Sequence, residues 1–334
     1  MSHPAVTTDS RLRAAVIGLG QAGSRFDEEP GRKVVWSHVG AYLGLPDRVA
    51  IGGAVEIAPV NAAAFHARCP NVPLYTDIGR MIAECRPQIA SICTPAESHG
   101  DVLFHLLQCK DLRLIWCEKP LSSDFDEAQH MVEVCRARGV KLMVSYNRHW
   151  LPVWRSVQAR IYEGALGTLR SVRVAFPNRL FSIGSHAVDL ALMLGGPVED
   201  ISALRLSGLE ETGEPAVAAI LRYVSGAAGI VQVTGLSRQL MVEAEAIGDD
   251  GRLFAREDHG SITIERFGPS RLYTGYRQLG MPRVEQTNDA GFSAFAAMAE
   301  NAVDAITRDA PLACDGAHAL EVQRVLDLMA AAKA

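Results

Sequence analysis

The sequence lacks the features of several protein classes. Its seven cysteines are scattered and include no C-x-x-C pair, which argues against a disulfide scaffold and a zinc site, so we expect no bound metal. No apolar run approaches the ~18 residues of a membrane span, and the N-terminus shows no signal-peptide pattern, which predicts a cytoplasmic protein. Without a G-x-S-x-G or H-E-x-x-H motif, a hydrolase has little support.

Positive charge is also in short supply. The chain of 334 residues has 33 Lys and Arg against 38 Asp and Glu, a formal net charge of -5. Nucleic-acid binding needs clustered positive charge, so nucleic acid is not expected as a partner. The hydrophobic content of 48% is typical of a globular protein, and the length suits two domains.

Two patterns of secondary structure divide the chain. In the first third, apolar runs alternate with helical patterns, which indicates βαβ units and a parallel sheet; strands are expected at residues 12–17, 49–56, 89–93 and 112–117. Further on, strands follow one another through hairpin turns; they are expected at residues 171–176, 216–223, 229–234, 241–247 and 261–267. The expected fold is α/β, with an N-terminal Rossmann doubly wound parallel sheet in residues 1–121. Residues 122–334 are expected to form a C-terminal α+β domain with a large open, mostly antiparallel sheet.

A glycine motif follows the first expected strand. Gly18, Gly20 and Gly23 form G-x-G-x-x-G, with Gln21 and Ala22 between the last two, and a helix is expected to start there. In a dinucleotide site the first glycine allows a tight turn, the second lets the backbone approach the pyrophosphate, and the third allows close helix–strand packing. The motif predicts a dinucleotide-binding loop; the alternative is a glycine-rich turn without a ligand.

An acid ends the second expected strand. Glu56 can accept hydrogen bonds from both hydroxyls of an adenosine ribose, and its charge would repel a 2′-phosphate, which favours NAD(H) without excluding NADP(H). It follows Gly23 by 33 residues instead of the usual ~20, so residues 26–33 are expected to be an inserted loop. The alternative is a solvated carboxylate at a strand end.

A lysine ends the fourth expected strand, in the tripeptide Glu118-Lys119-Pro120. Ligands of open α/β sheets bind beyond the carboxyl ends of the strands, so Lys119 is expected beside a substrate. There it can donate to the reacting oxygen or exchange its proton. Taken alone, a lysine at a strand end is more often a surface residue.

Together with motifs further along, these residues resemble a known family. The glycine motif, Thr94-Pro95 with His99, Glu118-Lys119-Pro120 and the segment 184–189 (Gly-Ser-His-Ala-Val-Asp) occur in the order found in Gfo/Idh/MocA oxidoreductases. The resemblance covers nearly the whole chain. It implies an NAD(P)-dependent dehydrogenase or reductase of sugars, nucleotide sugars or inositols. It also implies a small-molecule carbohydrate substrate and an open sheet that forms the interface of a homodimer or homotetramer.

The resemblance further implies roles for individual residues. Lys119 would be the catalytic lysine, and His186 would be the general base in oxidation and the acid in reduction. The cofactor is expected to meet Gly18, Gly20, Gln21, Ala22, Gly23, Glu56, Thr94, Pro95, His99 and Glu118. The substrate is expected to meet Lys119, Tyr146, Arg148, Ser182, His186 and Asp189. For Asp189 a helix cap is the alternative, and for Arg148 and His149 a place at the surface.

One position departs from the family pattern. Many sugar and inositol dehydrogenases of the family carry an aspartate four residues before the histidine, where this chain has Ser182. A carboxylate would orient the imidazole and stabilise its protonated form, whereas a hydroxyl only orients it. Either His186 is a weaker base, with Lys119 or Tyr146 handling more of the proton, or the chemistry differs from the inositol type. The run 180–186 is more similar to the nucleotide-sugar branch.

Two hypotheses of different classes follow. The leading one is an NAD(H)-dependent oxidoreductase that transfers hydride between the nicotinamide and a ring carbon of a sugar, nucleotide sugar or inositol-type polyol. The alternative, motivated by Ser182, is a dinucleotide-binding sensor or scaffold without turnover.

Overall fold

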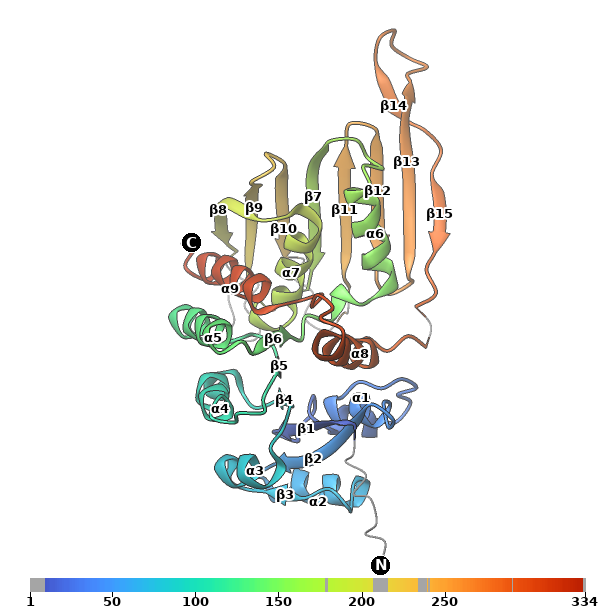
Figure 1. The fold of residues 1–334 in the computed structure, drawn as a ribbon. Helices are drawn as coiled ribbons and strands as arrows, with labels where there is room; N and C mark the ends of the chain where they lie inside the picture. Colours follow the sequence, from blue (N-terminus) through green and yellow to red (C-terminus); the bar gives the residue numbers. More distant parts are fainter. Residues whose placement is uncertain are drawn as a thin grey trace, which may run out of the picture. The chain divides into compact units, whose positions relative to one another are not determined.

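The structure is a computed structural model that describes residues 10–177, 180–206, 216–233, 239, 241–289 and 291–332, apart from the side chains of Ser182 and Val233. The chain forms two compact units (Figure 1). The first contains Met1–Ser145 and Ser293–Gly316, and the second contains Tyr146–Phe292 and Ala317–Ala334.

The first unit is built on a six-stranded parallel sheet in the order β3-β2-β1-β4-β5-β6. Its strands are β1 (Leu12–Ile17), β2 (Val49–Val55), β3 (Leu74–Tyr75), β4 (Ile89–Ile92), β5 (Leu114–Cys117) and β6 (Lys141–Val144). Strands β4 and β5 are buried throughout, as in sheets covered on both faces. This order is that of a doubly wound dinucleotide-binding sheet and confirms the expected fold class of this part.

Several helices of this unit start after a short polar residue that caps them. They are α1 (His38–Leu43), α2 (Pro59–Arg68), α3 (Ile78–Cys85), α4 (His99–Leu106), α5 (Phe125–Arg138) and α8 (Ala294–Thr307). Before four of them, a side chain accepts a hydrogen bond from the backbone N–H three residues later; these caps are Ser37, Asp77, Asp124 and Ser293. Each such cap satisfies one of the N–H groups that a helix start leaves open and so fixes where the helix begins.

The helix expected after the glycine motif is interrupted. Ser24 N donates to Gly20 O as in a helix, but Ala22 O accepts from His38 N and Gly23 O from Val39 N. In an unbroken helix Ala22 O would accept from residue 26, so twelve extra residues separate the two turns. Subtracting these twelve from the 33 residues between Gly23 and Glu56 leaves 21, the usual spacing. The inserted loop is therefore confirmed and is longer than residues 26–33.

The inserted loop is held by Asp27. Its carboxylate accepts from Trp36 N at 2.6 Å and Ser37 Oγ at 2.5 Å, and it pairs with Arg68 of α2 at 2.8 Å. Arg68 also donates to Ser24 O at 2.8 Å. These bonds close the loop at its base, so the chain re-enters the helix at His38.

The second unit is built on a nine-stranded mixed sheet in the order β14-β13-β12-β11-β7-β10-β9-β8, with β15 beside β13. Its strands are β7 (Leu169–Phe176), β8 (Val198–Arg205), β9 (Val217–Tyr223), β10 (Ala228–Val233), β11 (Glu243–Gly248), β12 (Gly251–Arg256), β13 (Ser261–Pro269), β14 (Arg277–Leu279) and β15 (Arg283–Gln286). Only β7 and β10 pair in parallel among these strands, so the expected mostly antiparallel sheet is confirmed. Strand β8 was missed because its side chains are mostly exposed and give little apolar pattern.

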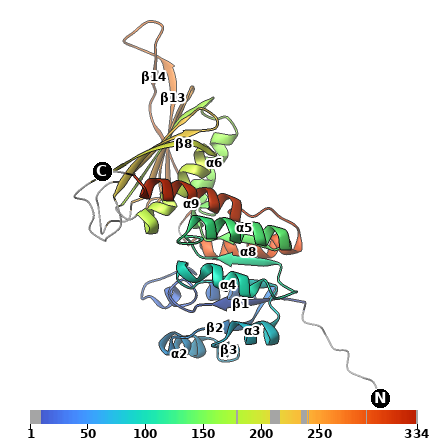
Figure 2. The same ribbon diagram turned by 90° about the vertical axis from the view of Figure 1, so that its left-hand side faces the viewer.

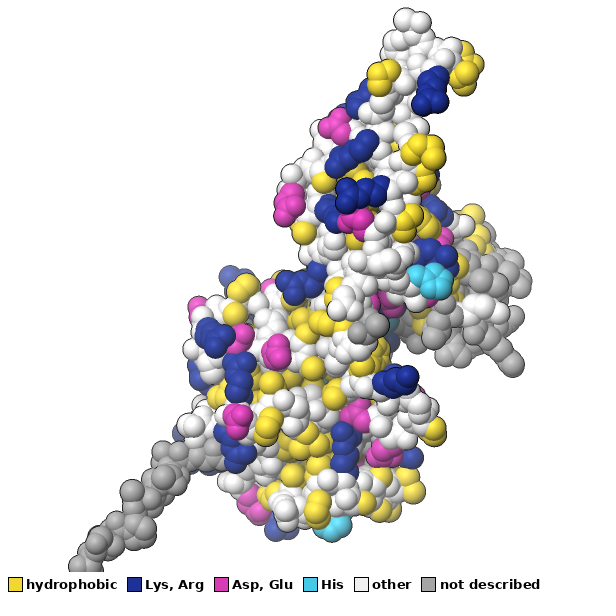
Figure 3. Space-filling view, turned by 90° about the vertical axis from the view of Figure 1, so that its right-hand side faces the viewer, with side chains coloured by type: hydrophobic (Ala, Val, Ile, Leu, Met, Phe, Trp, Pro, Cys, Tyr) yellow, Lys and Arg dark blue, Asp and Glu magenta, His cyan; other side chains and the backbone are white. Residues whose placement is uncertain are grey.

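Helices cover one face of this sheet. Helix α7 (Ser185–Gly195) packs on β7 and β10, and α6 (Pro152–Tyr162) packs on β12 and β13 (Figures 1 and 2). The opposite face carries apolar side chains: Ile220 pairs across the strands with Ile230, and both are exposed. Exposed hydrophobic side chains also lie among arginines on the β13–β15 edge, which faces the viewer in Figure 3; they include Tyr273, Tyr276, Met281 and Val284.

The division into units differs from the expected boundary after residue 121. Strand β6 pairs with β5, so α5 and β6 complete the first sheet, and residues 293–316 return to the same unit as α8. Among the described residues, no helix has both the length and the apolar character needed to cross a membrane.

Candidate active site

A cavity of about 550 Å³ opens in the first unit at the carboxyl ends of β1, β2 and β4. Ligands of doubly wound sheets bind at this edge. Its lining includes five of the residues expected to meet the cofactor, namely Gly18, Gly20, Glu56, Thr94 and Pro95. Gln21, Ala22, Gly23, His99 and Glu118 do not line it.

The three glycines of the motif differ in what would surround a side chain at each position. Gly18 has φ +86°, and a Cβ there would lie 2.8 Å from Cys93 O. A Cβ at Gly23 would lie 2.1 Å from Gly18 O. A Cβ at Gly20 would meet nothing within 4 Å. Gly18 and Gly23 are thus required by the packing of the turn itself, whereas Gly20 keeps open the space that a pyrophosphate needs, so the loop fits a dinucleotide.

The Glu56 carboxylate fastens the glycine loop to the end of β2. It accepts from Leu19 N at 2.7 Å and from the backbone N–H groups of Ile57 and Ala58, both at 2.8 Å. Asn61 Nδ2 donates to it at 3.3 Å. At 8% exposure it is not the solvated carboxylate of the alternative interpretation, although it still borders the cavity.

His99 does not line the cavity but contacts the loop after β4, which does. Its Nε2 contacts Thr94 O at 2.8 Å and its Nδ1 contacts Leu121 O at 3.1 Å, and the ring is buried. The ring therefore ties the loop after β4 to the segment that follows Lys119. Both ring nitrogens thus contact backbone carbonyl oxygens, and the expected cofactor contact of His99 stays a prediction.

Glu118 ends a buried hydrogen-bonded chain. Its Oε1 contacts His38 Nε2 at 3.0 Å, His38 Nδ1 contacts Ser91 Oγ at 2.9 Å, and Tyr42 Oη contacts the same Ser91 Oγ at 2.7 Å. Burial works to raise the pKa of Glu118, but the hydrogen bond and charge of His38, with smaller contributions from Ser145 and Lys119, outweigh it and lower the pKa. Glu118 is thus held as a carboxylate by His38 and is bound to protein groups instead of lining the cavity.

Lys119 leaves the sheet at the same edge as the cavity. It follows β5, whose Cys117 pairs with Ile92 of β4, two residues before Thr94. Its side chain is half-buried, and its backbone N–H donates to Glu118 Oε2 at 3.4 Å. A lysine placed there can reach out from the strand ends, as its expected role requires.

The second unit brings two predicted residues together. His186 is the second residue of α7, and its ring meets that of Tyr146 edge to face, with the centroids 5.8 Å apart. Tyr146 is fully buried and His186 is half-buried. His186 and Tyr146 therefore share one environment, whereas Lys119 belongs to the first unit, and joint action of Lys119 and His186 stays a prediction.

Arg148 is held inside the second unit. It makes a two-point ion pair with Glu257, at 2.7 Å from Nε and 2.8 Å from Nη2, and Trp154 Nε1 donates to the same carboxylate at 2.7 Å. Arg148 and His149 are only 8% and 7% exposed. A surface position is therefore wrong for both, and the guanidinium of Arg148 is bound to Glu257. The expected substrate contact of Arg148 stays a prediction.

Asp189 is fully buried and faces two histidines. Its Oδ1 lies 2.8 Å from Nε2 of both His149 and His318. Burial works to raise its pKa, but His149 and His318 outweigh it and lower the pKa. Helix α7 has no side-chain cap, so the capping role expected as an alternative is wrong. The side chain of Ser182 lies outside the described residues, so its effect on His186 stays a prediction.

Sequence reasoning missed His38, Ser91 and Tyr42. His38 lies one helical turn beyond the glycine motif once the inserted residues are removed, and this was its only signal in the sequence. Its partner Glu118 is 80 residues away, and no local pattern links the two.

Comparisons with known proteins agree with this geometry. Residues 12–146 match the model of the GFO_IDH_MocA family, described as an oxidoreductase family with an NAD-binding Rossmann fold. The chain is 29% identical over 257 residues to a D-apiose dehydrogenase of Paraburkholderia graminis, which covers 70% of this chain and 63% of that protein. It is 24% identical over 254 residues to an inositol 2-dehydrogenase of Rhizobium meliloti, over 71% and 75% of the two chains. The first three curated relatives are matched over 63%, 54% and 54% of their lengths.

Solved structures share the fold along nearly the whole chain. The WlbA dehydrogenase of Bordetella pertussis, in complex with NADH and UDP-GlcNAcA, has a TM-score of 0.74 at 20% identity and covers 96% of this chain and 95% of its own. A super-repressor mutant of Gal80p from Saccharomyces cerevisiae has a TM-score of 0.77 at 14% identity, over 96% and 95%. At these identities the likeness concerns the fold.

Proposed function

We propose that the chain is a member of the Gfo/Idh/MocA oxidoreductase family and a dehydrogenase or reductase that uses NAD(H), because residues 12–146 match the family model and the relatives named above are dehydrogenases. Its substrate is a sugar, nucleotide sugar or inositol-type polyol, and the hydride moves between the nicotinamide and a ring carbon. The observation that carries the proposal is the cavity at the strand ends, which combines an open Gly20 with a carboxylate at the end of β2.

The residues of the first unit bind and orient the cofactor. Gly18 allows the tight turn, and Gly20 leaves the backbone free to approach the pyrophosphate. Glu56 accepts from the ribose hydroxyls and repels a 2′-phosphate, which favours NAD(H) over NADP(H). Thr94 and Pro95 border the same cavity just beyond the carboxyl end of β4. The bound nicotinamide supplies the hydride exchange.

The proton of the reacting hydroxyl is handled by the chain's own side chains. Lys119 donates to the substrate oxygen, which polarises the carbon–oxygen bond. His186 removes the hydroxyl proton during oxidation and returns it during reduction. The ring of Tyr146 packs against His186 and positions it.

An assay of turnover tests the proposal. NAD(P)H absorbance is followed in both directions with inositols, free sugars, sugar acids and UDP- or GDP-sugars. One compound class is expected to react, Lys119→Ala is expected to lose most of kcat while still binding NAD(H), and exposed Lys110→Ala serves as the matched control. Turnover that Lys119→Ala leaves intact would overturn the role of this lysine.

The alternative function is a sensor or scaffold that binds the dinucleotide without turnover. It is motivated by Ser182 in place of the family aspartate, and the fold is also that of a super-repressor mutant of Gal80p, whereas the curated relatives named above are dehydrogenases. Binding of NAD(H) without reaction of any compound in the panel would support the sensor.

We also propose a homodimer or homotetramer, supported by the exposed apolar residues Ile220 and Ile230 on the open face of the second sheet. Sedimentation that gives only a monomer would contradict this. The cytoplasmic location stays a prediction from the sequence.

A further inference from the structure

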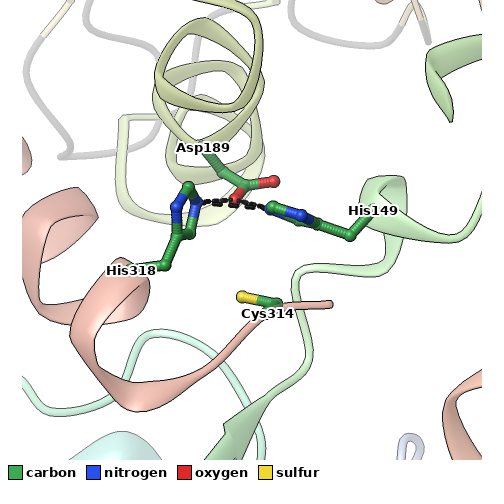
Figure 4. A group of neighbouring side chains, drawn as sticks. All are labelled: His149, Asp189, Cys314 and His318. Carbon is green, nitrogen blue, oxygen red and sulfur yellow. Dashed lines mark hydrogen bonds and ion pairs between the residues drawn. The ribbon is translucent and has the colours of Figure 1, made fainter. Parts of the chain in front are cut away.

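Three metal-ligating side chains converge inside the second unit. His149 ends the turn Asn147–His149, Asp189 lies on α7, and His318 lies on α9 (Gly316–Ala330). The Nε2 atoms of the two histidines lie 2.8 Å from Asp189 Oδ1 and 3.2 Å from each other. Figure 4 shows both rings pointing their Nε2 atoms at the carboxylate.

Hydrogen bonds alone satisfy this cluster poorly. If both histidines donate to Asp189, two N–H groups must share one oxygen, Oδ1, while standing 3.2 Å apart. The other oxygen, Oδ2, is buried and has no hydrogen-bond partner among the described residues. A buried polar atom without a partner costs about 1–3 kcal/mol, so the arrangement is better explained by a ligand that the three groups hold together.

The spacing fits a small divalent cation. A tetrahedral zinc ion with bonds of about 2.0–2.1 Å places its ligand atoms about 3.3 Å apart. The two imidazole nitrogens already lie at nearly this separation, and the carboxylate oxygen lies slightly closer. Two imidazoles and one carboxylate form a donor set that zinc binds readily.

We propose that His149, Asp189 and His318 bind one zinc ion. The fourth position is open to a water. The ion joins α9 to α7 and to the turn after β6, so its role is structural: it fixes helix α7, on which His186 lies one turn before Asp189. No step of the proposed reaction passes through it.

This inference departs from the sequence analysis, which argued against a zinc site because no C-x-x-C pair is present. The ligands come from three segments 40 and 129 residues apart, so no local spacing could reveal them. It is independent of the proposed hydride transfer, because it is measured as metal content and not as turnover.

The test uses the full chain without a histidine tag, since a tag would itself bind zinc. The protein is loaded with zinc sulfate and desalted, and bound metal is measured by mass spectrometry. We expect about one zinc ion per chain in the unsubstituted protein and a loss of most of it in His318→Ala and in Asp189→Asn. His66→Ala, at an exposed position on α2, is the matched control and should keep the zinc.

A second measurement does not depend on the variants. Zinc should raise the thermal midpoint of the unsubstituted protein and a chelator should lower it, because a ligand that binds only the folded chain stabilises it. Circular dichroism shows whether each variant is folded. The proposal is overturned if the unsubstituted protein keeps almost no zinc after loading, or if folded His318→Ala and Asp189→Asn bind as much zinc as it does.

Discussion

His38 should stabilise the first unit chiefly through two polar contacts, and His38→Phe isolates them. Phenylalanine can keep the ring packing against Trp116, whose centroid lies 3.9 Å from that of His38, and against Phe295 at 5.5 Å. It removes the contacts with Glu118 at 3.0 Å and with Ser91 at 2.9 Å. A hydrogen bond to a charged group contributes about 1.5–3 kcal/mol to stability and a neutral one about 1 kcal/mol. The free energy of unfolding of His38→Phe should therefore be about 3 kcal/mol lower than that of the unsubstituted protein.

The loss should depend on pH in a definite direction. Because the pKa of Glu118 is lowered in the fold, its ionised form stabilises the folded state above the ordinary carboxyl pKa of 4.5. This contribution is lost as the pH falls through the lowered folded value. In His38→Phe the effect of burial is no longer opposed by the histidine, so the pKa of Glu118 rises. The difference between the two proteins should therefore be larger at pH 7 than at pH 4.

Urea unfolding, followed by tryptophan fluorescence and circular dichroism at both pH values, measures these differences. For a unit of this size a loss of 3 kcal/mol lowers the thermal midpoint by about 6–12 °C. A double-mutant cycle with Glu118→Gln should give a coupling energy of about 1.5–3 kcal/mol. Exposed His66→Phe, the control, should change stability by less than about 0.5 kcal/mol. The reasoning would be refuted if His38→Phe lowered the free energy of unfolding by less than about 0.5 kcal/mol, or by the same amount at pH 4 and pH 7.

Three further predictions concern the glycine loop, Glu56 and Arg148. Gly20→Ala should leave the free energy of unfolding unchanged but weaken NAD(H) binding, measured by calorimetry, at least about tenfold. The Cβ of Gly23→Ala would lie 2.1 Å from Gly18 O, so this variant should lower the free energy of unfolding by more than about 3 kcal/mol. Equal stability of the two variants would contradict this. Glu56→Gln should lose about 2 kcal/mol of the free energy of unfolding, because its amide NH₂ group would face backbone N–H donors. It should also reduce the preference for NAD(H) over NADP(H), and unchanged affinities for both cofactors would exclude the ribose role of Glu56. Arg148→Met removes the ion-pair partner of Glu257, so the free energy of unfolding measured in urea should fall by about 3–5 kcal/mol. The double variant with Glu257→Leu should recover most of this loss. A loss under about 1 kcal/mol in Arg148→Met would show that the ion pair is not important for stability.

The sequence by itself determined the fold class and the cofactor loop. Strand β1 was predicted at its observed bounds, and the apolar runs that became β4 and β5 are buried throughout, because a parallel sheet covered on both faces needs continuous apolar strands. The glycine motif and Glu56 were found because a turn, a close backbone approach and a strand-end acid are all local requirements of one short segment each. Even the inserted loop was predictable, from the excess length between Gly23 and Glu56.

Only the tertiary structure decided which polar groups are partners. Arg148 looked like a surface or substrate residue, and the fold buries it against Glu257, 109 residues later. Asp189 looked like a substrate contact or a cap, and the fold places it between His149 and His318. His38 drew no attention, and the fold joins it to Glu118 beside Lys119. A short motif reports what its own backbone requires, whereas the partner of a buried charge is set by which distant segments the two sheets bring together.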